Sequence, residues 1–242
     1  MANENILAAN TELGFKYEIQ RDLIREFQIA FRQKSFAQTE ISTCGDTGFA
    51  SFGGSCVTYH GLFPTLEMLN MASSARHNPE LFLQSLANHF PGNSPVVWIP
   101  AAATPRLYDM IRFVKPDALV FNTDICATPV CTIPFSNPKD IERGVYAGYV
   151  LDVLKSPFAE LFDVIATDAF LTRFSKEDRV KVLQIFYKAL KPGGVLLTTV
   201  RNPKVGESSP LQLTEIENKD SHNYSEKVLI AYRKLVRRAG NP

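Results

Sequence analysis

Short runs of apolar residues, each bounded by turn residues, recur through the second half of the chain. Continuous apolar runs of this length are typical of strands that are buried on both faces. They predict strands at 96–99, 118–122, 149–151, 163–166 and 195–200. Helical spacing between the runs predicts helices at 105–113 and from Ser175 onward, where Ser175 and Asp178 fit a capping box. Strands alternating with helices predict an α/β fold with a mostly parallel sheet.

Prolines interrupt this alternation after the second predicted strand. Pro129, Pro134 and Pro138 lie where the fold would place the next helix. Proline lacks an N–H group and disfavours a helical conformation in the residue before it. We therefore predict a loop over residues 126–138.

The first 92 residues follow a different pattern. Apolar residues at three- and four-residue spacing predict helices at 17–36, 64–75 and 79–89. Glycines and polar residues break this spacing between residues 39 and 61. We expect a mostly helical cap at 1–92, lying over the carboxyl edge of the sheet, and an α/β domain at 93–242.

Composition narrows the classes of function. The 242 residues include 26 basic and 25 acidic side chains, a net charge of +1, so there is no strong field to attract nucleic acid. The sequence has no apolar run of about 18 residues and no signal-like N-terminus, so we expect a cytoplasmic protein with no membrane partner. Its cysteines have the spacing of neither a disulfide framework nor a zinc site, and no metal is predicted. They are Cys44, Cys56, Cys126 and Cys131.

Three aspartates directly follow predicted strands. They are Asp124, Asp152 and Asp168. The carboxyl ends of parallel strands meet at one edge of the sheet, and ligands of such folds bind outside that edge. We expect the three carboxylates to cluster there. The alternative for each is a structural role, because aspartate is common at turns and helix starts.

Two motifs in the second half of the chain carry a family resemblance. Leu161-Phe162-Asp163-Val164-Ile165 is followed, one helix later, by Leu190-Lys191-Pro192-Gly193-Gly194. Together they resemble class I S-adenosylmethionine (SAM)-dependent methyltransferases, over about residues 94–200. The resemblance implies a Rossmann-like sheet, SAM as cofactor and in-line transfer of a methyl group to a small-molecule acceptor. The family sheet normally ends with two further strands that have no counterpart here, so it is smaller or another segment or subunit, as in a homodimer, covers its edge.

The resemblance also assigns roles by position. Asp124 falls where the family binds the ribose hydroxyls, and Asp152 where it contacts the adenine amino group. Asp168 is nearest to methyl transfer and would orient the acceptor or take its proton. The implied cofactor-binding residues are Pro100, Ala101, Ala102, Thr104, Asp124, Ile125, Asp152, Val153 and Thr167. Tyr59 and His60, in the glycine-rich part of the cap, are candidate substrate or lid residues.

The loop after the first strand departs from the family pattern. Trp98 stands at its acidic position, and Pro100, Ala102 and Thr104 stand at its three glycines. Glycine there allows a positive φ and a close approach of the backbone to the ligand. Either this loop has another shape and still holds SAM, or the site has lost the cofactor. The following helix, with Thr104 placed as its N-cap, still offers N–H groups to a carboxylate such as the methionine end of SAM.

Two other functions compete with methyl transfer. A catalytically inactive methyltransferase-like fold that binds a ligand or a partner would account for the missing glycines, and the fold alone does not decide function. A nucleotide-dependent oxidoreductase is disfavoured, because no Gly-x-Gly-x-x-Gly sequence follows a predicted strand.

Overall fold

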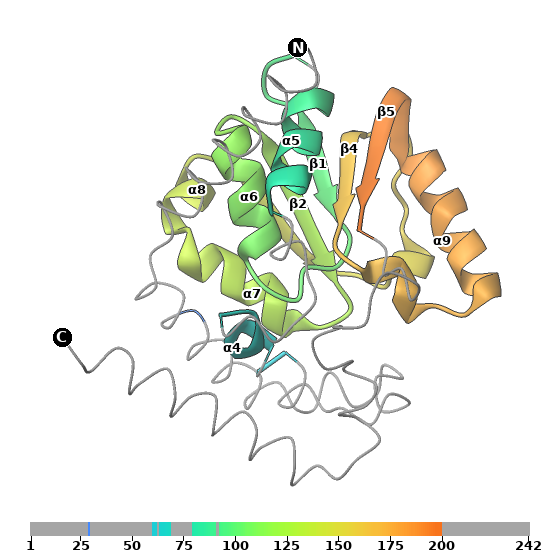
Figure 1. The fold of residues 1–242 in the computed structure, drawn as a ribbon, viewed down its shortest axis with the longest axis horizontal. Helices are drawn as coiled ribbons and strands as arrows, with labels where there is room; N and C mark the ends of the chain where they lie inside the picture. The colour runs from blue at the N-terminus through green and yellow to red at the C-terminus, as the bar shows by residue number, and fades with distance from the viewer. Residues whose placement is uncertain (1–28, 30–59, 62, 69–78, 91, 200–242) are drawn as a thin grey trace, which may run out of the picture.

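Five parallel strands form one sheet in the order β3-β2-β1-β4-β5 (Figure 1). The computed structural model describes residue 29 and residues 60–61, 63–68, 79–90 and 92–199. The strands are β1 Val96–Ile99, β2 Leu119–Asp124, β3 Tyr146–Val150, β4 Phe162–Thr167 and β5 Leu190–Thr198. The predicted α/β class and parallel sheet are confirmed. The helix predicted at 17–36 lies almost entirely outside the described residues.

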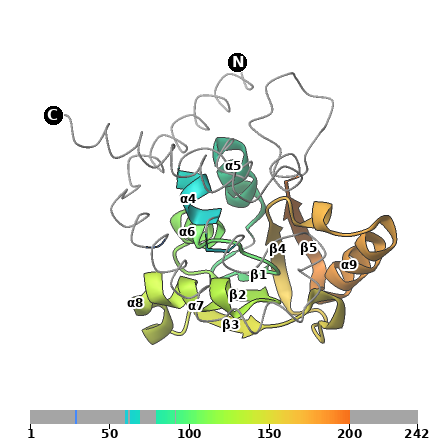
Figure 2. The same cartoon turned by 90° about the horizontal axis from the view of Figure 1, so that it is seen from below.

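Helices cover both faces of the sheet (Figures 1 and 2). The helices are α4 Phe63–Met68, α5 Pro79–His89, α6 Arg106–Val114, α7 Ala127–Ser136, α8 Pro138–Glu142 and α9 Lys176–Ala189, with short 3-10 turns η3 Val153–Lys155 and η4 Phe170–Arg173. The predicted start of α5 at Pro79 is confirmed. Within the described part of the chain, no helix is long and apolar enough to cross a membrane.

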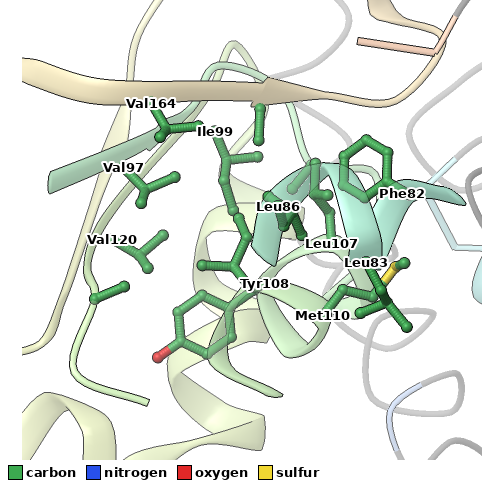
Figure 3. Close-up of a cluster of buried hydrophobic side chains, with 14 of the residues drawn as sticks. Phe82, Leu83, Leu86, Val97, Ile99, Leu107, Tyr108, Met110, Val120 and Val164 are labelled. Atoms are coloured by element: carbon green, nitrogen blue, oxygen red, sulfur yellow. The ribbon is translucent and has the colours of Figure 1, made fainter. Parts of the chain in front are cut away.

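The apolar core is divided by the sheet into two clusters. Helices α5, α6 and α7 pack on one face, where Val97 and Ile99 of β1 meet Leu86 and Tyr108 (Figure 3). Helix α9 packs on the other face around Trp98. The Trp98 indole stacks on Phe162 at a ring-centroid distance of 5.2 Å and donates to Thr123 Oγ1 at 2.9 Å. Trp98 is thus a core residue with its one polar atom satisfied.

The two motifs that carry the family resemblance meet at the amino-terminal edge of the sheet. Asp163 accepts hydrogen bonds from the Val96 backbone N–H at 2.8 Å and from Lys191 Nζ at 2.8 and 2.9 Å. One carboxylate therefore joins the first residues of β1, β4 and β5. Gly193, with φ of +79°, forms the bulge that lets β5 continue past Lys191, where we had predicted that the strand begins only at residue 195.

The predicted loop over 126–138 is wrong. Residues Ala127–Ser136 form α7, and Pro138–Glu142 form α8. Pro129 lies in the first turn of α7, and Pro138 is the first residue of α8, where no helical hydrogen bond requires their N–H groups. Pro134 does lie inside α7, and because proline has no N–H group, the Val130 carbonyl has no helical donor four residues further along. The Tyr146 hydroxyl donates to the Val130 carbonyl at 3.0 Å and replaces it.

Replacing Tyr146 by phenylalanine should therefore lower the free energy of unfolding by about 1 kcal/mol, because the Val130 carbonyl would lose its donor. Burial raises the pKa of Tyr146 to about 12, so its hydroxyl keeps its proton at neutral pH. The measurement is chemical denaturation. Tyr149→Phe is the control, since Tyr149 lies in the same strand and is half exposed. Equal effects of the two substitutions would contradict this role of Tyr146.

Strand β3 also differs from its prediction, which placed it at 149–151. It spans Tyr146–Val150 at the edge of the sheet, where it pairs only with β2. Three of its five residues are half-buried and two are exposed. Gly148 interrupts the apolar run of this strand, and the prediction began only after it, whereas the strand also includes Tyr146 and Ala147.

A polar cluster fixes α8 against α6. Asp140 accepts hydrogen bonds from the Tyr108 hydroxyl at 2.7 Å and from Arg112 Nη2 and Nε at 2.9 and 3.2 Å. Arg112 also donates to the Ala118 carbonyl at 3.1 Å. Burial disfavours the Asp140 carboxylate, but Tyr108 and Arg112 outweigh this effect and lower its pKa.

Candidate functional site

The carboxyl-terminal ends of the strands bring the predicted site residues to one edge of the sheet. The loop after β1 contains Pro100–Thr104, and Asp124 ends β2. Asp152 follows β3, and Asp168 follows β4. The strand order reverses between β1 and β4, and this is where doubly wound sheets open a crevice for a ligand.

The loop after β1 packs inward although it lacks glycine. Pro100, Ala102 and Thr104 are buried, while Ala101 and Ala103 are half-buried. No residue of this loop has a positive φ, so its path does not require glycine. The helix α6 begins at Arg106 with Pro105 as its N-cap, so the placement of Thr104 as N-cap is wrong by one residue.

The Thr104 hydroxyl joins this loop to the cap. It donates to Glu67 Oε2 in α4 at 2.6 Å and accepts from the Arg106 backbone N–H at 3.4 Å. Glu67 is only 5% exposed. A carboxylate at the start of a helix is stabilised by the helix dipole. Helix α4 thus supplies a carboxylate near the start of α6.

Asp124 lies in a second buried cluster with His60 and Cys126. The Asp124 Oδ1 atom accepts from the Cys126 backbone N–H at 2.8 Å, and the carboxylate is only 5% exposed. Burial raises the pKa of Asp124 to about 6, although His60 and the Cys126 N–H oppose this effect. The carboxylate is therefore ionised at neutral pH but is costly to keep so.

His60 is 1% exposed and makes a side-chain hydrogen bond with Cys126. Burial alone would lower its pKa, but Cys126 and the Asp124 carboxylate outweigh both burial and the charge of Arg173, so the pKa of His60 is raised. The structure thus places a residue predicted to meet substrate against the residue predicted to bind the cofactor. Tyr59 lies outside the described residues.

Asp152 caps the short turn η3, which is the structural role given above as the alternative to contacting the adenine. Its Oδ1 atom accepts from the Leu154 N–H at 3.0 Å, and Oδ2 is 3.6 Å from Lys155 Nζ. Val153 is buried in the cluster around Trp98, and Ile125 is half-buried.

The end of β4 carries a hydroxyl-rich cluster. Thr199 Oγ1 donates to Asp168 Oδ1 at 2.5 Å and accepts from the Ala169 N–H at 2.8 Å. Thr167, which is buried, donates to Thr198 Oγ1 at 2.7 Å. Asp168 is thus held in place by Thr199 and is half-buried.

The described residues contain no group of three or more His, Cys, Asp or Glu side chains that could hold a metal ion. Cys44 and Cys56 lie outside those residues. The hydrogen bonds of Cys126 with His60 and Asp124 join the segment at residue 60 to the end of β2.

Two residues of the site were missed in the sequence. Glu67 was not singled out, although it is the one Asp, Glu, Lys or Arg between residues 47 and 75. A lone charge in so long an uncharged stretch is a signal for a specific partner. Cys126 has neither disulfide nor zinc-site spacing, and its sequence context assigns it no place in the site. Nothing near it in the sequence indicates His60.

No protein-family model matches the chain, and no curated protein sequence does. Solved structures resemble it, and methyltransferases recur among them. One is the 1,6-didemethyltoxoflavin-N1-methyltransferase of Burkholderia thailandensis with bound S-adenosylhomocysteine, at 17% identity and a TM-score of 0.38, covering 50% of this chain and 53% of that chain.

Two further solved structures show that proteins described in other terms also resemble this chain. The [4+2]-cyclase SpnF is 15% identical with a TM-score of 0.47, covering 60% of each chain. A possible exported protein of Bordetella parapertussis is 14% identical with a TM-score of 0.44, covering 95% of this chain and 81% of that chain. Against several of the methyltransferases the match spans about half the length of the solved chain. At these identities the similarity concerns the fold alone.

Proposed function

We propose that this chain is a SAM-dependent methyltransferase that acts on a small-molecule acceptor. The position of Asp124 carries the proposal. It is a buried carboxylate at the end of β2, next to the point where the strand order reverses. In doubly wound sheets an acid at this place accepts hydrogen bonds from ribose hydroxyls.

The chemistry of the neighbouring groups fits SAM. Asp124 would accept the ribose hydroxyls, the start of α6 would hold the methionine carboxylate, and the turn at Asp152 would lie near the adenine. SAM supplies a methyl group bound to a positively charged sulfur. Transfer then requires mainly alignment and exclusion of water.

Asp168 would act on the acceptor. Its bond from Thr199 fixes the orientation of the carboxylate at the end of β4, where an acceptor hydroxyl or amine would lie. The carboxylate would hold that group in line with the methyl and take its proton where the acceptor must lose one.

Titration calorimetry with SAM and S-adenosylhomocysteine tests the proposal. We expect Asp124→Asn to weaken binding by about 1–3 kcal/mol, because an amide accepts the ribose hydroxyls less strongly than a carboxylate does. The control is Asp117→Asn, an acid at the amino-terminal edge whose Oδ2 accepts from the Ser94 N–H at 2.6 Å and which should leave binding unchanged. Equal binding by parent and Asp124→Asn chains would show that the site is placed wrongly.

A specific observation favours a second candidate, a methyltransferase-like fold that binds a ligand or partner without catalysis. His60 is hydrogen-bonded to Cys126 and close enough to Asp124 for the carboxylate to raise its pKa, and Glu67 accepts from Thr104 before α6, so side chains of this chain already lie where SAM would bind. A folded chain that binds neither SAM nor S-adenosylhomocysteine at millimolar concentration, whether or not these two side chains are replaced, would make this the leading function.

A further inference from the structure

Two side chains of the cap contact the two places where the proposed cofactor would be held. Glu67 accepts from the Thr104 hydroxyl just before α6, and His60 is hydrogen-bonded to Cys126, where the Asp124 carboxylate is close enough to raise its pKa. Both belong to the short segment around α4, which lies at the carboxyl-terminal edge of the sheet (Figures 1 and 2).

The chemistry of these side chains matches that of the cofactor they would meet. At the start of α6 the cofactor would present a carboxylate, and Glu67 presents a carboxylate. At Asp124 the cofactor would present hydrogen-bond donors, and His60 presents a protonatable ring whose positive charge the carboxylate favours. A competitor for the site must present a carboxylate after β1 and a hydrogen-bond donor after β2, as the cofactor would. Glu67 and His60 present these two groups in the same places.

Both contacts are buried, so they compete strongly. Glu67 and His60 are 5% and 1% exposed. Buried hydrogen bonds that involve charged groups are among the stronger polar contacts in proteins, and a ligand must replace them before it gains its own. Since a ligand binds only the fraction of molecules whose site is open, a cap that is mostly closed lowers the apparent affinity by that fraction.

We propose that His60 and Glu67 are intramolecular competitors of the cofactor, and that the cofactor binds only when the segment carrying them withdraws from the sheet edge. This inference rests on the proposed function. It adds that the closed arrangement is an autoinhibited state, and that the loss of either side chain opens the site.

Cys126 reports this withdrawal directly. It is fully buried, hydrogen-bonded to His60 and is the N-cap of α7, whereas Cys131 lies within α7 and is exposed. The rate at which a maleimide labels each thiol is measured on the intact chain by peptide mass spectrometry. In the parent chain Cys126 should be labelled slowly and Cys131 quickly, so that Cys131 serves as an internal control five residues away in the sequence.

The decisive variant is Glu67→Gln, because it removes the carboxylate that accepts from Thr104 and leaves His60, Asp124 and Cys126 in place. We expect it to bind S-adenosylhomocysteine about tenfold more tightly and to speed the labelling of Cys126 but not of Cys131. His60→Gln provides a second, independent variant for the binding measurement. Glu177→Gln, an exposed acid in α9, should change neither property.

The outcomes separate this inference from the function on which it rests. Tight binding by the parent chain, unchanged in both variants and with Cys126 protected in the complex, overturns the competition and leaves the methyltransferase proposal standing. Absence of binding by every folded variant overturns the proposed function. Faster labelling of Cys126 together with tighter binding in Glu67→Gln supports both.

Discussion

Replacement of Asp140 by alanine is expected to lower the free energy of unfolding by about 3 kcal/mol, the size seen when one partner of a buried charged pair is removed. Its carboxylate is 15% exposed and is the acceptor for both Tyr108 and Arg112. Without it, the Tyr108 hydroxyl on a fully buried ring and a largely buried guanidinium would lose that partner at the same time. Chemical denaturation followed by circular dichroism measures the loss.

The matched control is Glu142→Ala, an exposed acid two residues further along the same helix, α8. It should change stability by no more than about 0.5 kcal/mol. A double-mutant cycle with Tyr108→Phe isolates the Tyr108–Asp140 bond, and we expect a coupling of about 1 kcal/mol or more. An Asp140→Ala chain as stable as the control would mean that α8 is not fastened to α6 by this cluster.

The chain should become more stable as the pH falls from 8 to about 5. Asp124 has a pKa of about 6 in the folded chain against an ordinary value of 3.8, so folding favours its protonated form. Its contribution to stability therefore grows as the pH falls from about 6 toward 3.8. Since one pKa unit corresponds to about 1.4 kcal/mol, the full effect is about 3 kcal/mol.

His60 acts in the same direction over a higher range of pH. Its pKa is raised in the folded chain, so the stability it contributes is complete below its ordinary pKa of 6.5 and is lost as the pH rises above that value. The charged or titratable groups that act on it are Cys126, Asp124 and Arg173. Below about pH 4 we expect stability to fall again as the pH is lowered. Asp140 has a lowered pKa in the folded chain, so its contribution to stability is lost when it is protonated.

Denaturation at several pH values separates the two groups. His60→Gln should remove the dependence above pH 6.5, and Asp124→Asn should remove the dependence between about pH 6 and 4. Asp124→Asn should also be at least as stable as the parent chain at pH 7.5, because it no longer buries a carboxylate. A parent chain whose stability is constant from pH 8 to 5 would rule out a buried carboxylate at this position.

The sheet could be predicted from the sequence because its signals are local. Val96–Ile99 is a continuous apolar run and is β1 with the predicted bounds. Ser175 caps α9 by accepting from the Asp178 N–H at 3.1 Å, as the capping box implied. The motif residues Asp163 and Lys191 contact each other directly, so their separation in the sequence reflects one feature of the fold.

The prediction failed where a distant residue changes the meaning of a local signal. Pro134 is compatible with α7 because Tyr146, from the next strand, satisfies the Val130 carbonyl. Glu67 acquires its role from Thr104, 37 residues away. The position of Asp124 at a strand end was predictable, but its burial and its histidine neighbour depend on how the cap lies on the sheet.

The contacts of Asp163 also bear on the order in which the chain can fold during synthesis. Strand β1 forms its first pairing with β2, but its other edge waits for β4, and Val96 waits for a hydrogen-bond acceptor 67 residues further along. Until that stretch leaves the ribosome, the growing chain carries an open strand edge that includes Val97 and Trp98. Open apolar edges pair readily with other chains. The central part of the sheet therefore completes late, and a nascent chain stopped before β4 would be a substrate for chaperones.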